Sequence, residues 1–191
     1  MKEIADKFEH LFQVVSSKTF LNKEALGGEI PFFISAYDAT KENEVARAIR
    51  GLVNKLEENG IHVLELNLFD ICCQILEEKG GIERMFRVER AKSKDKFLRA
   101  LQSSLNIHSV LMPKISELID AAEADVYFLT GIGLVYPYLR SHNVLNNLQN
   151  IAKEAPTVTF FPGEYDGHSL NLFGALKDDN YYRAFNIENI K

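Results

Sequence analysis

This sequence has few cysteines, few prolines and no long apolar run. Of its 191 residues, 2 are Cys and 5 are Pro. No stretch of about 18 residues is both apolar and uncharged, so no segment is predicted to cross a membrane as a helix. Residues 1–12 carry Glu3, Asp6 and Glu9, which the apolar centre of a secretory signal does not tolerate. We therefore expect a cytoplasmic protein.

The two cysteines are not expected to form a disulfide with each other. Cys72 and Cys73 are neighbours in a predicted helix, where consecutive side chains point about 100° apart. We interpret both as small buried hydrophobic residues in a reducing compartment.

The composition is that of a globular chain. Hydrophobic residues make up 46% of the sequence and charged residues 26%, which argues against disorder and against a fibrous repeat. A chain of 191 residues can bury one full α/β core and is short for two domains of ordinary size. We predict a single domain over residues 1–191.

Charge is distributed unevenly along the chain. The net charge of −5 lowers the expectation of a protein that binds nucleic acid by bulk electrostatics. Residues 83–99, the basic segment, nevertheless carry three acidic residues against seven basic ones, namely Arg84, Arg87, Arg90, Lys92, Lys94, Lys96 and Arg99. Solvated helix faces explain such a run most simply. An acidic partner surface and a DNA backbone are the alternatives.

Apolar periodicity divides the first third of the chain into helices and strands. Residues 1–27 are predicted to hold a pair of N-terminal helices, and the following apolar run is typical of a strand covered on both faces. The order strand, helix, strand makes the two strands parallel, with a right-handed connection. The predicted elements are helices at 3–17 and 19–26, a strand at 30–37, a helix at 41–59 and a strand at 61–68.

Residues 69–124 form a long insertion between the second and third predicted strands. Helical spacing dominates this insertion, with breaks at Gly80-Gly81 and near Ser93, a residue type that caps helices. Because the strands already form the core, this helical insertion is where we expect a specific partner surface.

The last part of the chain returns to alternating strands and helices. Strands are predicted at 126–129, 157–161 and 182–187, with a helix at 144–153. This alternation indicates an α/β protein with a doubly wound, mainly parallel sheet of about five strands. An apolar first strand that leads into a helix gives this fold a P-loop-like topology.

The catalytic parts of a P-loop protein are nevertheless absent. The phosphate-binding loop needs the pattern GxxxxGK[ST], but the loop after the first strand reads SAYDATKENE, without a glycine. Lys41 follows Thr40 outside the required frame. The third strand ends in Leu129-Thr130, where a carboxylate should hold the water of the metal.

The segment LTGIGLVYPYLRSHNVLNNLQ (129–149) places glycines and many polar groups directly after the third strand. A dinucleotide-binding loop would need a third glycine where Tyr136 stands. We therefore interpret Gly131 and Gly133 as turn residues with positive φ or close backbone approach. Ser141 is predicted to cap the next helix. Arg140, His142 and Asn143 would then lie near the ligand edge of the sheet.

Ligands of such sheets bind outside the carboxyl ends of the strands. The residues at these ends are Tyr37, Asp38, Asn67, Asp70, Thr130 to Gly133, and Pro162 to Tyr165. His142 and His168, together with Glu164 and Asp166, are candidates for a metal site or an acid–base pair. Hydrogen bonds that fix loops are the preferred explanation, so no metal, cofactor or catalytic residue is predicted. The candidate binding residues are Arg140, His142, Asn143, Glu164, Tyr165 and His168.

The segments RSHNVLNNLQ and FFPGEY carry a resemblance to a known family. Together with EIPFFI and the terminal YYRAFNI, they resemble the BrxB family, a small component of the BREX bacteriophage-defence systems. The resemblance implies a cytoplasmic subunit of a multi-protein complex, alongside a large ATPase, a methyltransferase and a PglZ-type protein of the phosphatase superfamily. The family has no established catalytic motif, so the resemblance implies a pathway and no reaction.

Three functional hypotheses follow. The leading one is a non-catalytic subunit that docks other BREX proteins through the helical insertion or through the loop and helix after the third strand. The second is a nucleotide-binding or hydrolytic protein with a degenerate site at the strand ends. The third is contact with DNA through residues 83–99.

Overall fold

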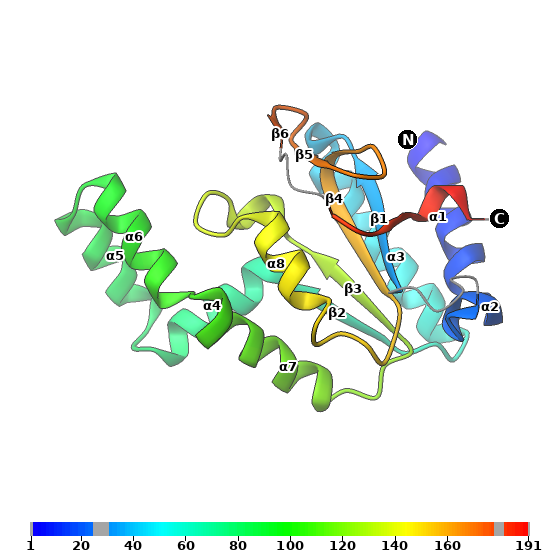
Figure 1. Cartoon of the computed structure of the whole chain (residues 1–191), viewed down its shortest axis with the longest axis horizontal. Coiled ribbons are helices and arrows are strands. Elements are labelled where there is room, and N and C mark those ends of the chain that lie inside the picture. Colours follow the sequence, from blue (N-terminus) through cyan, green and yellow to red (C-terminus); the bar gives the residue numbers. More distant parts are fainter. Residues whose placement is uncertain (1, 25–30, 178–181, 191) are drawn as a thin grey trace.

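A computed structural model describes residues 2–24, 31–177 and 182–190 of the chain. Its centre is a sheet in the order β2-β3-β4-β1-β7 (Figure 1). Each neighbouring pair along this order is parallel. The strands are β1 (Phe32–Tyr37), β2 (Val63–Asn67), β3 (Val126–Thr130), β4 (Thr157–Tyr165) and β7 (Phe185–Asn186).

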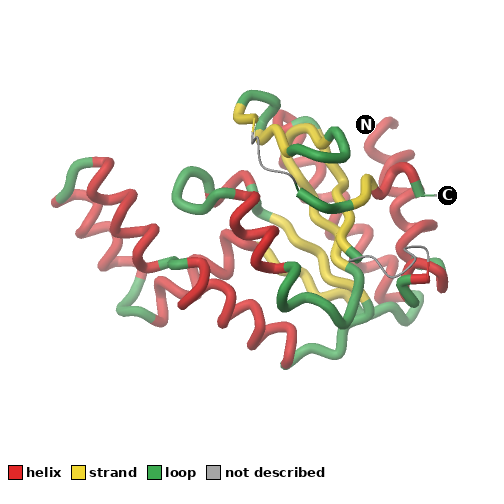
Figure 2. Tube along the Cα trace, viewed as in Figure 1, coloured by secondary structure: helices red, strands yellow, loops and turns green. Residues whose placement is uncertain are grey.

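The middle of the sheet is buried on both faces, as the continuous apolar runs predict. All five residues of β3 are buried, and so are the first four residues of β1. Because successive side chains of a strand point to opposite faces, each strand supplies two separate apolar clusters. Helices cover both clusters (Figure 2).

Three helices cover one face of the sheet: α1 (Lys2–Val15), α2 (Lys18–Leu21) and α3 (Glu42–Glu58). They pack on Phe33, Phe128 and Phe160. The rings of Phe128 and Phe160 meet edge to face, with centroids 5.2 Å apart. Full burial of one such side chain contributes about 1.5–3 kcal/mol to the free energy of unfolding, so this aromatic cluster fixes the α3 face.

The opposite face is covered by segments that follow β2 and β3. They are α4 (Leu68–Glu78), a π-helical turn (Ile107–Leu111), α7 (Met112–Asp120) and α8 (Ser141–Leu148). Their apolar sides pack on Phe32, Leu66 and Leu129 of the sheet. The helices thus lie on both faces, and the predicted α/β fold with a doubly wound, mainly parallel sheet is confirmed.

The middle of the helical insertion leaves the sheet. Helices α5 (Ile82–Ala91) and α6 (Lys94–Ser104) form a helical hairpin that projects beyond α4 (Figure 1). Ser93 stands at the N-cap position of α6, but its side chain makes no capping hydrogen bond. The chain enters and leaves this α5–α6 hairpin at nearby points. Lys79, just before α5, donates from Nζ to the carbonyl oxygen of Ser104, the last residue of α6, at 3.0 Å.

A small antiparallel extension was not predicted from the sequence. Strand β4 continues through Pro162 to Tyr165, where the sequence predicted a loop after the strand. Its end pairs with β5 (Leu170–Leu172), and β5 pairs with β6 (Leu176–Lys177). Apolar alternation over two or three residues is too short to predict such strands.

Several predicted boundaries also need correction. Helix α2 ends at Leu21, and the remainder of the helix predicted at 19–26 lies partly outside the described residues. Ser141 is the first residue of α8 and not its cap; Arg140 holds the cap position without a side-chain hydrogen bond. The last strand is shorter than the predicted 182–187 and pairs only with β1.

Across residues 2–24, 31–177 and 182–190, the structure contains no helix with the length and apolar character needed to traverse a bilayer.

Candidate functional site

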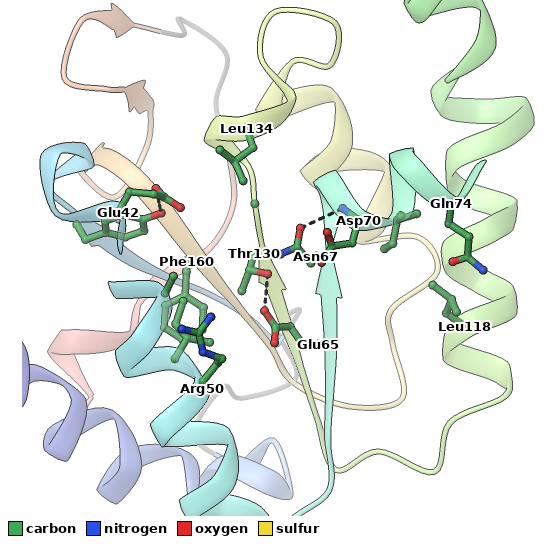
Figure 3. Close-up of a pocket in the computed structure, with 15 residues that line it drawn as sticks. Glu42, Arg50, Glu65, Asn67, Asp70, Gln74, Leu118, Thr130, Leu134 and Phe160 are labelled. Atoms are coloured by element: carbon green, nitrogen blue, oxygen red, sulfur yellow. Dashed lines mark hydrogen bonds between the residues drawn. The ribbon is translucent and has the colours of Figure 1, made fainter. Parts of the chain in front are cut away.

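A cavity of about 500 Å³ opens at the carboxyl ends of β1, β2 and β3 (Figure 3). Sequence reasoning predicted this position, and five of the residues named at the strand ends line the cavity: Tyr37, Asn67, Asp70, Thr130 and Gly131. Helix α3 supplies Glu42 and Arg50 to the same cavity. We call it the strand-end cavity.

The wall formed by β2 and β3 is polar on the α3 side. Glu65 and Asn67 alternate with Leu66, which packs on the opposite face, so both point toward α3. Thr130 Oγ1 donates to Glu65 Oε1 at 2.8 Å. Because Thr130 is buried, this bond satisfies a hydroxyl that water does not reach freely.

A second hydrogen bond closes the β1 side of the strand-end cavity. The hydroxyl of Tyr37 donates to Glu42 Oε2 at 2.7 Å. Burial, followed by this bond and the charge of Glu42, raises the pKa of Tyr37 far above its usual value. The phenol therefore stays protonated at physiological pH and serves as a hydrogen-bond donor, not as a base.

The turn after β3 depends on two glycines. Gly131 has a φ of +71°, and a Cβ there would lie 2.5 Å from Asn67 Oδ1. That oxygen caps α4 by accepting from the amides of Phe69 and Asp70 at 3.0 and 3.3 Å. Gly133 has no positive φ, but a Cβ would lie 2.9 Å from the ring of Phe173. The prediction of positive φ or close approach is confirmed: both apply at Gly131, and close approach applies at Gly133.

The loop after β1 offers no cradle for phosphate. Asp38 Oδ1 accepts hydrogen bonds from the amide and the hydroxyl of Thr40, at 2.9 and 2.7 Å. These two bonds lower the pKa of Asp38, so its carboxylate stays charged. The amide of Thr40 is therefore already bonded to a carboxylate and is not available to a phosphate. This agrees with the absence of glycine from the loop sequence.

Arg50 is the distinctive charge of the strand-end cavity. Its side chain is exposed and makes no hydrogen bond or ion pair among the described residues. Three carboxylates, Glu42, Glu65 and Asp70, line the same cavity. The excess of negative charge weakens attraction for phosphate groups, while Arg50 remains available to one small anionic group.

Metal-ligating side chains do not cluster in the part of the chain that the structure describes, and the Cys72 thiol is not activated. No group of three or more His, Cys, Asp or Glu side chains lies close enough to hold a metal ion among those residues. Cys72 is buried, and burial raises the pKa of its thiol to about 12. A thiol with that pKa is protonated at neutral pH and is a poor nucleophile.

The predicted binding residues of the β3–α8 segment lie away from the strand-end cavity. Arg140 and Asn143 are exposed and line a separate hollow of about 380 Å³, between α8 and the segment after α6. His142 is half-buried on α8. The structure therefore brings Arg140 and Asn143 together beside the helical insertion, not at the strand ends.

The other predicted binding residues belong to the β4–β5 extension. Glu164 accepts from Asn171 Nδ2 at 3.0 Å across the two strands. The hydroxyl of Tyr165 contacts the carbonyl oxygens of Tyr182 and Ala184 at 3.1 and 2.8 Å. His168 is exposed in the turn between the strands. Glu164 thus links β4 to β5, and Tyr165 links the end of β4 to the chain before β7.

The basic segment lies entirely on the α5–α6 hairpin and its turn. All seven of its cationic side chains are exposed. Within the described ranges none of them forms an ion pair, although Arg84 donates to the carbonyl oxygen of Lys79 at 3.3 Å. Some lysines elsewhere are paired, such as Lys55 with Glu9 at 2.8 Å and Lys114 with Glu78 at 2.8 Å.

Sequence reasoning missed Arg50 and Glu65 because they lie inside a helix and a strand, not after a strand. Glu65 left a signal that went unused. A single carboxylate within the apolar strand IHVLELNL marks a place where one face of an edge strand is uncovered. Arg50 left no such signal, since exposed arginines are ordinary on amphipathic helices.

Fold and site together define an α/β protein with a polar strand-end cavity and a projecting basic hairpin. The family model described as BREX protein BrxB matches residues 64–187. A BREX protein BrxB of Bacillus cereus (strain H3081.97) is 36% identical over 189 residues, which cover 98% of each chain. One of Escherichia coli O9:H4 (strain HS) is 31% identical over 173 residues, 91% of this chain and 86% of the relative.

The chain belongs to the BrxB family, as its resemblance predicted. No solved structure matches it.

Proposed function

We propose that this protein is a non-catalytic assembly subunit of a BREX phage-defence system, which acts in the cytoplasm by docking other proteins of that system. Membership of the BrxB family supports the pathway. The observation that carries the assembly role is the α5–α6 hairpin, which projects from the sheet as a structured element (Figure 1).

The α5–α6 hairpin contributes little to the core. Met85 is its only buried side chain, and α6 has none. Ordering these residues costs conformational entropy of about 1–2 kcal/mol per residue for the backbone alone. A helix pair that buries so little is typical of a surface that becomes covered when a partner binds.

The chemistry of the site also favours binding over catalysis. The phenol of Tyr37 stays protonated, the thiol of Cys72 is buried, and the carboxylate of Asp38 occupies the loop where a phosphate would bind. Each group is held in a state that stabilises the fold and is poorly suited to attack a substrate.

Co-purification tests this proposal. The tagged full chain is co-expressed with each BREX component in turn: the PglZ-type protein, the large ATPase and the methyltransferase. We expect at least one of them to co-purify in fixed proportion with the chain. If none does, the assembly role is wrong.

A hairpin replacement locates the contact. A Gly/Ser linker in place of residues 80–103 can join the two ends, because Lys79 and Ser104 are already in contact. We expect a variant that still unfolds cooperatively and no longer captures the partner. The double variant Arg87→Glu/Arg90→Glu keeps both helices and should lose capture as well. Retained capture by both variants would move the interface to another part of the protein.

A second candidate function is the binding of a nucleotide or another small anion in the strand-end cavity. The charge of Arg50, which has no ion pair with a described residue, favours it. A ligand at 100 times its dissociation constant should raise the free energy of unfolding by about 2.7 kcal/mol. Thermal shifts with ATP and GTP test it, with Arg50→Gln as the control. Unchanged melting temperatures with both nucleotides would exclude nucleotide binding.

A further inference from the structure

A mainly apolar groove runs between the α5–α6 hairpin and the loop after β3. Its volume is about 390 Å³. The floor consists of Phe97, Leu98 and Leu101 of α6, with Pro137 and Tyr138 of the loop. The two walls are about 40 residues apart in the sequence, so only the tertiary structure forms this groove. We call it the hairpin groove.

The hairpin groove joins the two docking surfaces that the sequence suggested separately. One was the helical insertion, and the other was the loop and helix after the third strand. Tyr138 lines both the hairpin groove and the neighbouring hollow that contains Arg140 and Asn143. The two surfaces are therefore continuous through this tyrosine.

The rim of the hairpin groove is charged on the hairpin side. Lys92 and Lys94 lie on it with Glu89 and Asp95. Beyond the rim, the remaining cations of the basic segment are exposed and lack ion-pair partners among the residues described. Unpaired cations grouped on one element leave a positive potential that attracts acidic groups.

Starting from the proposed assembly role, we infer that the hairpin groove binds an acidic amphipathic segment of a partner protein. The apolar side chains of that segment fill the floor between α6 and Pro137. Its carboxylates face the cations of the basic segment. Recognition of this kind combines apolar anchors with a charged rim, as in helix-in-groove complexes.

DNA is the less favoured occupant of the same surface. A duplex presents phosphates, which gain nothing from an apolar floor. An acidic peptide satisfies the positive charge and also covers the exposed faces of Phe97 and Leu98, so one occupant accounts for both properties.

Site-specific crosslinking identifies the occupant. The photoreactive residue p-benzoylphenylalanine replaces Leu98 in the full chain, co-purified with the BREX component that it captures. We expect crosslinks to a partner segment that is rich in Asp and Glu and has apolar residues at helical spacing. The same group at Phe173, an exposed aromatic position on the β5–β6 turn, should give no crosslink to that segment.

The outcomes separate this inference from the proposed function. Co-purification without crosslinks from position 98, or with crosslinks to a basic or uncharged segment, overturns the groove inference and leaves the assembly role standing. Crosslinks to nucleic acid overturn it in favour of DNA. If no BREX component co-purifies, both fail.

A charge reversal tests the rim independently of the floor. Lys92→Glu/Lys94→Glu should weaken partner binding at least tenfold, and wild-type binding should weaken as salt rises. Lys94 begins α6, where an acidic residue suits the helix dipole, so the variant should fold. Lys18→Glu/Lys177→Glu is the matched control: Lys18 also begins a helix, and both lysines are exposed. Equal binding by the two double variants overturns the inference.

Discussion

The sheet with its covering helices and the α5–α6 hairpin contain similar residue types in different environments. On the sheet, Phe33, Phe128 and Phe160 are buried beneath α1, α2 and α3. On the hairpin, Phe86 is 44% exposed and Phe97 is half-buried. Burial of apolar area stabilises the sheet and its covering helices, whereas the hairpin leaves part of its apolar area exposed to solvent.

The cations of the two regions differ in the same way. Lys7 contacts Glu188, and Lys55 pairs with Glu9 while its ammonium lies 3.9 Å from the centroid of the Phe12 ring. The basic segment has no ion pair within the described ranges. Helical periodicity alone does not tell which cations have partners; the packed structure does.

The largest expected difference between the regions concerns buried phenylalanine. Phe128→Ala should lower the free energy of unfolding by about 3–5 kcal/mol, because it leaves a cavity under α3. Phe86→Ala on the hairpin should stay within about 0.5 kcal/mol, as ordinary surface changes do. Urea unfolding followed by circular dichroism measures both. Equal losses would mean that the hairpin is part of the cooperative core.

A helix cap should give the next largest effect. Asn67→Ala removes the oxygen that accepts from the amides of Phe69 and Asp70, which should cost about 1 kcal/mol of unfolding free energy. Asn67→Asp keeps an acceptor at the N-terminus of α4 and should retain most of the stability. The corresponding change on the hairpin, Ser93→Ala, should have a smaller effect, because Ser93 makes no capping bond.

Single lysines should distinguish the two regions more subtly. Lys55→Ala loses an exposed ion pair and an aromatic contact, so we expect a loss of about 0.2–1 kcal/mol. Lys96→Ala, on the hairpin, loses no ion pair with a described residue and should leave the melting temperature unchanged. Differential scanning calorimetry at low and high salt checks this, since salt should reduce only the first effect.

The smallest expected effect depends on pH. Hydrogen bonds from the amides of Ser169 and His168, and from the Ser169 hydroxyl, lower the pKa of Asp166 to about 2 from 3.8. The stability that follows from this shift is present above the unfolded pKa and is lost as pH falls through about 2.

Asp166→Asn removes that titration from the β4–β5 turn. The wild-type chain should melt above the variant near neutral pH, and the difference should shrink as the pH is lowered toward 2. Melting curves across that range measure it. If the difference in melting temperature stayed constant with pH, Asp166 would stabilise the turn through interactions that do not depend on its charge.

The sequence predicted the regular parts of this fold well. Strands β1, β2 and β3 and helices α1 and α3 fall close to the predicted ranges, because their apolar residues repeat with a clear period, and β4 begins where it was predicted. It also named Tyr37, Asn67 and Thr130 as strand-end residues, and all three line one cavity, since the carboxyl ends of parallel strands share one edge. Strands β5 and β6 were missed because two or three residues carry no measurable period.

The candidate site was predicted only in part. Arg140 and Asn143 were expected at the strand ends and lie beside the helical insertion, because the turn at Pro137 and Tyr138 carries the chain toward α6. No rule of spacing gives the direction in which such a loop leaves the sheet. Arg50 and Glu65 were missed for the reason that their neighbours in space are not neighbours in the chain.

The sequence by itself determined the α/β class, the parallel strands, the missing P-loop residues and the family, because each depends on residue types at short spacing. Only the tertiary structure decided which polar residues share a cavity, which lysines have partners, and that α6 and Tyr138 enclose one groove. Those properties depend on long-range packing, which periodicity does not encode.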